Sequence, residues 1–267
     1  MKKYWHVIGI GIQNNLTYRV NYLARTLFSF IPLFAMLSLW RQIYNQQNGA
    51  PLSGYTAAQM IFYYLMVAVV DVLTAVNEDD WQIAADIREG NISQFLLKPI
   101  DYLWYRLCLF ISGRIAFMSM ACIPLAVFIF CFRGYFVAPV TGPAFAAFLA
   151  SIVLTAMLQF FISYAMAMLA FWFLEISTLI FILFAFEYLA SGHLFPLDLL
   201  PAMLQHALWY TPFPSMLYVP IAIYMGKISG ARIALGLGMQ VMWLVLAYGL
   251  ARFAWQRGIR KYAAFGG

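Results

Sequence analysis

The sequence is short of charge. Asp, Glu, Lys and Arg make up 10% of its 267 residues, while 64% are hydrophobic and 18% are aromatic. An average soluble domain has about 25% charged residues. A chain this apolar cannot cover a water-exposed surface, so lipid must be its solvent. The composition therefore predicts an integral membrane protein, and no run of residues is polar enough to form a separate soluble domain.

The sequence also lacks the motifs of nucleotide, metal and hydrolase sites. It contains no GxxxxGK[ST] phosphate-binding loop, and Gly9-Ile10-Gly11 lacks the third glycine of a dinucleotide site. No His and Glu stand at metal-ligand spacing on one helix. Ser191 and Ser215 have no evident histidine and acid partners. We therefore expect no catalytic residue, cofactor or metal in this chain; if the protein uses ATP, another chain binds ATP and Mg²⁺.

Cysteine is scarce as well. Cys108, Cys122 and Cys131 all fall in one apolar stretch, with no CxxC pair. This placement predicts three buried thiols that pack as small hydrophobic groups. A cleaved signal peptide is not expected, because only a short apolar run follows Lys2-Lys3 and no small-residue cleavage site is present.

The basic residues are unevenly placed. Most lie before or near the start of the first long apolar stretch, at or after the end of the last one, or in or beside a central polar loop: Lys2, Lys3, Arg19, Arg25, Arg88, Lys98, Arg106, Arg114, Arg252, Arg257, Arg260 and Lys261. If these three regions share one side of the membrane, only Arg41, Arg133, Lys227 and Arg232 lie opposite. This bias predicts a polytopic membrane protein with both termini in the cytoplasm. The net charge of +6 is then a topology signal, and nucleic acid is not an expected partner.

Six apolar stretches are long enough to cross a bilayer, since a helix needs about 20 apolar residues to span roughly 30 Å of hydrocarbon. They are residues 22–44, 59–77, 105–132, 144–171, 174–194 and 230–252. An even number of spans agrees with both termini on one side. The sequence thus predicts an all-α polytopic membrane protein with six transmembrane helices in a single domain, residues 1–267.

Residues 3–20 differ in kind from the spans. Trp5, Ile8, Ile12 and Leu16 recur at three- and four-residue spacing among polar side chains. The pattern is typical of an amphipathic helix in the plane of the membrane interface, in contact with lipid. A frayed cytoplasmic tail is the alternative.

Residues 193–229, between the fifth and sixth spans, are apolar but interrupted by prolines. The prolines are Pro196, Pro201, Pro212, Pro214 and Pro220. Pieces too short to cross the bilayer predict re-entrant helices on the external side, buried in protein or lining a cavity. One further span at 202–225 is the rival interpretation, and it would move the C-terminus outside.

The longest polar interruption is residues 78–101. It holds six of the ten acidic residues: Glu78, Asp79, Asp80, Asp86, Glu89 and Asp101. Asp79 or Asp80 can cap a helix, Ile83 and Ile87 form one apolar face, and Gly90 suits the end of the helix. A structured, charged element between the second and third spans predicts a docking surface for a partner.

Two acidic residues lie within predicted spans. Asp71 and Glu187 cost about 2.5–3.5 kcal/mol each in a bilayer and are expected to face a cavity or a partner. They line a polar translocation path or proton relay, or they pair with an Arg or Tyr of a neighbouring helix. The sequence leaves both interpretations open.

Three segments, in order, resemble the membrane subunit of ABC-2-type ABC transporters of about 260 residues. Residues 86–99, DIREGNISQFLLKP, are similar to the I-R-x-G-x-[IL]-x-x-[FY]-L-L-x-P segment that follows the second span in that family. The second segment is the proline-rich stretch 195–226, and the third is RGIRKYAAFGG at 257–267.

The resemblance implies a non-catalytic permease subunit of an ATP-driven exporter. It implies two separate ATP-binding subunits, a second permease that is identical or homologous, and a coupling helix in the loop 78–101. The coupling interface would then consist of Trp81 as an anchor, Ile83 and Ile87 on its apolar face, Asp86, Arg88 and Glu89 in charge pairs, and Phe95 and Lys98 in the following turn. The aromatic-rich interior favours an amphipathic or lipid-like substrate.

Two alternative functions follow from other residues. A secondary transporter or channel would use Asp71 and Glu187 as relay groups and need no ATPase. A membrane-embedded lipid-modifying enzyme would rest on His193 and Asp198, which have the His-x-x-x-x-Asp spacing of acyltransferases.

Overall fold

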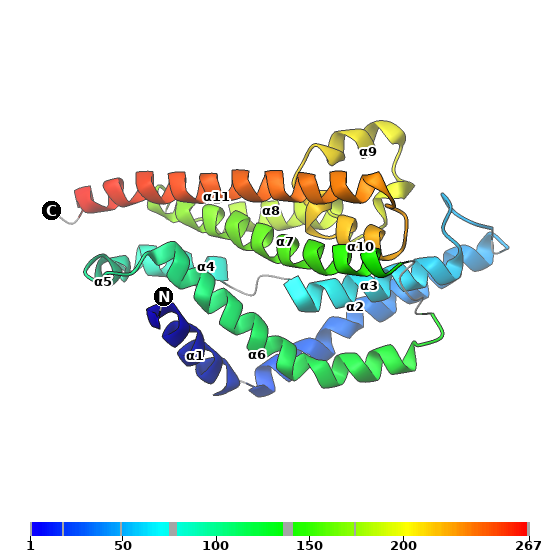
Figure 1. The fold of residues 1–267 in the computed structure, drawn as a ribbon, viewed down its shortest axis with the longest axis horizontal. Helices are drawn as coiled ribbons and strands as arrows, with labels where there is room; N and C mark the ends of the chain where they lie inside the picture. The colour runs from blue at the N-terminus through cyan, green and yellow to red at the C-terminus, as the bar shows by residue number, and fades with distance from the viewer. Residues whose placement is uncertain are drawn as a thin grey trace.

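The structure is a computed structural model that describes residues 2–17, 19–48, 50–74, 79–135, 141–173 and 175–265. These residues form helices joined by turns (Figure 1). The helices are α1 (Lys2–Thr17), α2 (Arg19–Gln46), α3 (Ala57–Thr74), α4 (Asp79–Arg88), α5 (Ile92–Leu96), α6 (Tyr102–Cys131), α7 (Gly142–Ala167), η1 (Met168–Phe171), α8 (Ser177–Ala190), η2 (Leu197–Leu199), α9 (Ala202–Trp209), η3 (Phe213–Met216), α10 (Tyr218–Tyr224) and α11 (Ala231–Phe265).

The long helices lie side by side in an elongated bundle (Figure 1). The helices α7 and α11 pack along each other, and α3 packs against α2, α6 and α7. One buried core surrounds α3 and α10, and a second surrounds α6, α7, η1 and α11. Both chain ends lie toward the end of the bundle that carries α4 and α5, whereas α9 and α10 lie toward the other end (Figure 1).

Helices occupy all six predicted span positions, but they do not all qualify as spans. Within the described residues, four stretches are long and apolar enough to cross a membrane: Ala57–Thr74, Tyr102–Cys131, Gly142–Phe171 and Ala231–Tyr262. The side chains of α2 are described only in part. The helix α8 has 14 residues and extends about 21 Å at 1.5 Å per residue, which is shorter than the hydrocarbon core. The chain is therefore a multi-pass membrane protein, with four such spans in its described part.

Local sequence explains where two of the spans begin. The carboxylate of Asp101 accepts a hydrogen bond from the backbone N–H of Trp104 at 3.1 Å and caps α6. Thr141 caps α7 in the same way through Ala144 at 3.2 Å, and Pro143 occupies the first turn. These side chains satisfy backbone donors that a helix leaves unpaired at its N-terminus.

The N-terminal segment forms a helix of its own, α1, which packs against α6. Gly11 makes this contact close, because a Cβ at that position would lie 2.2 Å from Oγ of Ser112. Trp5 of the same helix stays exposed. A separate helix therefore precedes α2, close to the predicted bounds 3–20.

The segment 193–229 is divided as its prolines predict. Pro196, Pro201 and Pro212 each directly precede a short helix, η2, α9 and η3 respectively. Because α9 ends at Trp209 and the chain turns at 210–212, the rival span at 202–225 does not form. The helix α10 is almost wholly buried among the longer helices.

The prediction of three buried thiols is wrong for two of them. Cys108 is buried, but Cys122 and Cys131 are exposed on the surface of α6. An apolar surface that faces lipid accepts a thiol as readily as a packed core does, so an apolar neighbourhood in the sequence does not establish burial.

Candidate coupling site

The polar loop folds into two short helices. The helix α4 ends at Arg88 and α5 begins at Ile92. Between them Gly90 has φ +79°, a left-handed conformation that glycine adopts at little cost, and this confirms its predicted place at the end of the helix. Glu78 and the side chains of Asp79 and Asp80 lie outside the described part of the structure. The helix cap predicted at Asp79 or Asp80 depends on those side chains and lies outside it as well.

The apolar face of α4 points into this chain. Ile83 and Ile87 are buried, and they belong with Ile92 to the core around α6 and α7. The helix α4 packs against α7 and η1. Their predicted place at the interface with another subunit therefore needs correction, because these side chains attach α4 to its own bundle. The periodicity identified the apolar face but could not say which neighbour covers it.

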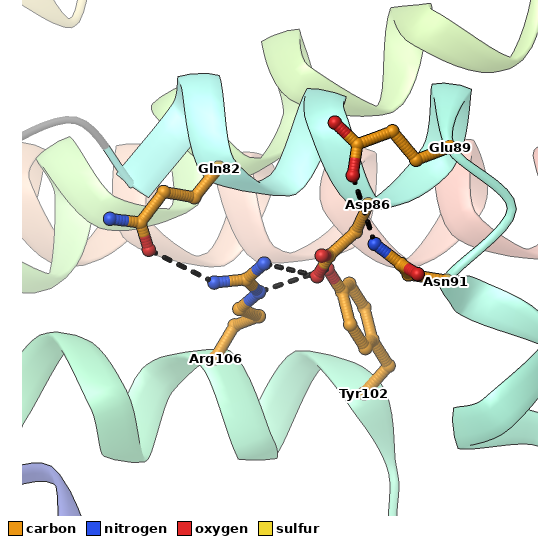
Figure 2. Close-up of polar contacts among 6 residues, drawn as sticks. All are labelled: Gln82, Asp86, Glu89, Asn91, Tyr102 and Arg106. Atoms are coloured by element: carbon orange, nitrogen blue, oxygen red, sulfur yellow. Dashed lines mark hydrogen bonds and ion pairs between the residues drawn. The ribbon is translucent and has the colours of Figure 1, made fainter.

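Asp86 is also turned inward, toward α6 (Figure 2). It forms an ion pair with Arg106, and its Oδ2 accepts a hydrogen bond from the Tyr102 hydroxyl at 2.8 Å. The guanidinium of Arg106 also donates to the Tyr102 hydroxyl at 2.9 Å and to Oε1 of Gln82 at 3.5 Å. A buried cation is tolerated when its donors are satisfied in this way. We call Asp86, Arg106, Tyr102 and Gln82 the α4–α6 clamp.

The same loop is tied to α11. Asp101, which caps α6, also pairs with Arg252 at 2.6 Å. The Tyr262 hydroxyl donates to the carbonyl of Gly90 at 2.9 Å. The ring of Tyr102 stacks on Trp255 with centroids 5.1 Å apart. At the N-terminal side, Lys3 donates to the carbonyl of Pro99. Contacts from both ends of the chain thus converge on the polar loop.

The outward side of the loop carries a mixture of apolar and charged groups. Trp81 is 38% exposed and Leu97 is 89% exposed. Arg88, Glu89 and Lys98 are exposed as well. We call these five residues the outer face of the loop. Of the predicted interface residues, only Trp81, Arg88, Glu89 and Lys98 belong to it, while Phe95 is half-buried and packs against Tyr102 and Tyr105.

The two intramembrane acids meet at one cavity. Asp71 from α3 and Glu187 from α8 both line a cavity of about 270 Å³, together with His193 and Gln159. Asp71 Oδ1 lies 3.0 Å from Nε2 of His193. From the sequence, each of these acids was expected to face a cavity or a partner, and Asp71 does both.

His193 belongs to a chain of hydrogen bonds that the sequence did not indicate. Its Nδ1 lies 2.7 Å from Oγ of Ser191. Ser191 therefore has a histidine partner, and the acid that contacts this histidine is Asp71 rather than Asp198. Asp198 instead accepts hydrogen bonds from the hydroxyls of Tyr55 and Tyr218, at 2.6 and 2.7 Å. Ser191 is fully buried. His193 and Asp198 have different partners, so their spacing in the sequence does not bring them into one site.

The family assignment rests on a match that covers most of the chain. A family model described as "ABC-2 family transporter protein" matches residues 30–266, which include the loop, the cavity and the α4–α6 clamp. The chain belongs to the ABC-2 family transporter proteins. This confirms the family resemblance seen in the sequence. A search of curated proteins found no match to the chain.

Membership of the ABC-2 family gives the coarse function. Permeases of this family are generally non-catalytic membrane subunits and usually work with ATP-binding subunits. The sequence of this ABC-2 chain did not indicate the groups that hold the loop, among them Tyr102, Arg252 and Tyr262. Arg106 offered one signal, since a charge inside a predicted span requires a partner. Which acid it meets depends on the fold.

Proposed function

We propose that this chain is the transmembrane permease subunit of an ATP-driven exporter in the bacterial inner membrane. Two separate ATP-binding subunits hydrolyse ATP, and a second permease, identical or homologous, completes the transporter. The chain crosses the membrane six times, and both termini lie in the cytoplasm. The further two spans are α2 and the stretch 175–194, which contains α8 and the residues on either side of it. The segment 193–229 forms re-entrant helices on the external side.

One observation carries this proposal: the outer face of the loop is exposed while its inner face is fixed to two long helices. Trp81 and Leu97 offer apolar area, and Arg88, Glu89 and Lys98 offer charges around it. Aromatic anchors surrounded by polar residues are typical of protein interfaces. We assign the outer face to contact with an ATP-binding subunit.

The clamp provides a route for coupling. An ATP-binding subunit that contacts the outer face differently in its ATP-bound and ATP-free states shifts the permease between two conformations by the difference in contact free energy. Through Asp86 and Arg106 a movement of α4 displaces α6, and through Asp101 and Arg252 it displaces α11. The two helices border the core that contains the substrate path in our proposal.

Asp71 and Glu187 line that path. Their shared cavity lies against α3, α7 and α8, and intramembrane acids commonly mark a substrate or ion pathway. A secondary transporter would use the same acids, but it gives no role to a loop that ion pairs hold to α6 and α11. The match to the ABC-2 family also favours the ATP-driven function over a secondary transporter.

The proposal is tested by co-expressing the full chain with its ATP-binding subunit and measuring their association. Trp81→Ala should weaken association by about 2 kcal/mol or more, roughly thirtyfold, as is usual for an anchoring aromatic residue. Arg88→Glu should uncouple ATP hydrolysis from transport while leaving insertion intact. Trp209→Ala is the matched control, because Trp209 ends α9 at the opposite end of the bundle (Figure 1). Equal association of Trp81→Ala and Trp209→Ala would refute the assignment, and so would unchanged coupling in Arg88→Glu. An outer face found outside the cytoplasm by topology tagging would also refute it.

A further inference from the structure

Two cavities adjoin each other between α7 and α8. The first, of about 270 Å³, is the one lined by Asp71, Glu187 and His193. The second, of about 340 Å³, lies between α7, α8, η3 and α11 and has walls that include Met166, Phe213 and Leu250. Ile162 and Leu183 belong to the walls of both. A molecule that passes these two side chains occupies both cavities at once.

The first cavity is rich in hydrogen-bond acceptors. Besides the two carboxylates, its wall contains Gln159, which is 5% exposed. The Nε2 group of Gln159 donates to the carbonyl of Met216 at 3.2 Å, and this bond fixes the orientation of the amide. Among the described residues, its Oε1 has no hydrogen-bond partner. Less than 1 Å² of this oxygen is exposed, so the acceptors that a ligand in the cavity can reach are the carboxylates of Asp71 and Glu187, which are partly exposed. Carboxylates accept hydrogen bonds from N–H or O–H donors.

The charge of the first cavity points in the same direction. Its described wall contains two carboxylates against one histidine, and it contains neither Lys nor Arg. Acidic side chains therefore outnumber basic ones in this wall. The side chain of Asp71 is 37% exposed, so a ligand can reach it. Phe184 and Tyr188 add aromatic rings to the wall, and aromatic faces attract cations.

The second cavity has the opposite character. Its wall residues are aliphatic or aromatic side chains and one proline, with the indole N–H of Trp243 as their polar side-chain group. A charged group would lose its hydration there without compensation. Hydrocarbon gains free energy from the same transfer.

We propose that the two cavities bind one amphipathic organic cation. Its head group, a primary ammonium or a guanidinium, lies between Asp71 and Glu187, and its apolar part lies in the second cavity beyond Ile162 and Leu183. The inference rests on the proposed function, because a permease needs a site for its substrate, and it names the substrate class. An inorganic cation would leave the apolar walls unused, and an anion would be repelled by the carboxylates.

Binding of radiolabelled octylammonium to the full chain tests this assignment. The protein is held in phosphatidylcholine nanodiscs without any ATP-binding subunit, and empty nanodiscs give the background from partitioning. We expect saturable binding that unlabelled octylammonium displaces at least tenfold better than octanoate or octanol, which have the same chain length. Glu187→Gln and Asp71→Asn should each weaken binding by roughly tenfold, since each removes a charge from the head-group site.

Glu175→Gln is the matched control. Glu175 is an exposed carboxylate that precedes α8 and accepts a hydrogen bond from the Ser177 N–H at 2.8 Å, and Gln keeps an acceptor there. Its binding should equal that of the unchanged chain. Equal displacement by octanoate and octylammonium overturns the proposal, and so does full displacement by sodium ions or an equal effect of Glu175→Gln and Glu187→Gln. The comparison of the three ligands uses the unchanged chain, so a variant that fails to fold does not affect it. Because no ATP-binding subunit is present, a failed binding test beside intact association with that subunit overturns the substrate class alone.

Discussion

Replacement of Asp86 by Asn tests whether the α4–α6 clamp holds the loop in place. Arg106 is 5% exposed, and Asp86 is its ion-pair partner. Removing one partner of a buried ion pair costs about 3–5 kcal/mol, because the other charge stays buried. The amide introduced by Asp86→Asn would keep an acceptor oxygen, and the Asp86 side chain is itself partly exposed, so we expect a smaller cost of about 2 kcal/mol.

This loss should appear as local opening of α4. The helix has ten residues, and an isolated helix of that length is marginal in water. A cost of 2 kcal/mol corresponds to about thirtyfold faster amide hydrogen exchange in residues 79–97, if α4 opens without global unfolding. The measurement is hydrogen exchange followed by mass spectrometry on the full chain, with peptides from α7 as an internal reference.

Glu89→Gln is the control on the same helix. Glu89 is exposed and accepts a hydrogen bond from the Asn91 amide at 3.1 Å, so its neutralisation should cost less than about 0.5 kcal/mol. Arg106→Lys should fall between the two, because Lys keeps the charge but cannot donate to Asp86 and Tyr102 as a planar fork. Unchanged exchange of α4 in Asp86→Asn, or an equal rise in Glu89→Gln, would show that the clamp does not hold the loop.

Two further predictions concern the packing of the bundle, and both are measured as the midpoint of thermal unfolding in detergent. Gly11→Ala should destabilise the protein by about 1–3 kcal/mol, because its Cβ would lie 2.2 Å from Oγ of Ser112. Gly9→Ala has no atom within 4 Å and should be neutral or stabilising by up to about 1 kcal/mol; equal midpoints would contradict the close approach of α1 to α6. Gln240→Leu should cost about 1–3 kcal/mol, since it removes the donor 2.9 Å from the carbonyl of Ser215. An unchanged midpoint would mean that this buried hydrogen bond contributes little.

Local signals in the sequence were sufficient for several elements. Gly90 marked the end of α4, because its backbone conformation depends on glycine itself, and the prolines of 193–229 marked the starts of short helices. The periodicity of Ile83 and Ile87 gave the correct face of α4. These features depend on neighbours within a few residues, which a sequence displays directly.

Features that depend on distant residues could not be predicted. Asp71 meets His193 across 122 positions, and Asp101 meets Arg252 across 151. A charge in an apolar stretch shows that some partner is required, but the partner is set by how helices pack. For the same reason the sequence put Ile83 and Ile87 at an external interface, whereas the bundle buries them.

The length of α11 has a mechanical consequence. Its 35 residues extend about 52 Å, which exceeds a 30 Å hydrocarbon core by about 22 Å. Arg252 and Tyr262, which join it to the loop, lie in its C-terminal half. An α-helix keeps its length unless its backbone hydrogen bonds break. The helix α11 is therefore expected to move as a rigid body, so that a displacement along its axis near Tyr262 is transmitted to Ala231 at its other end.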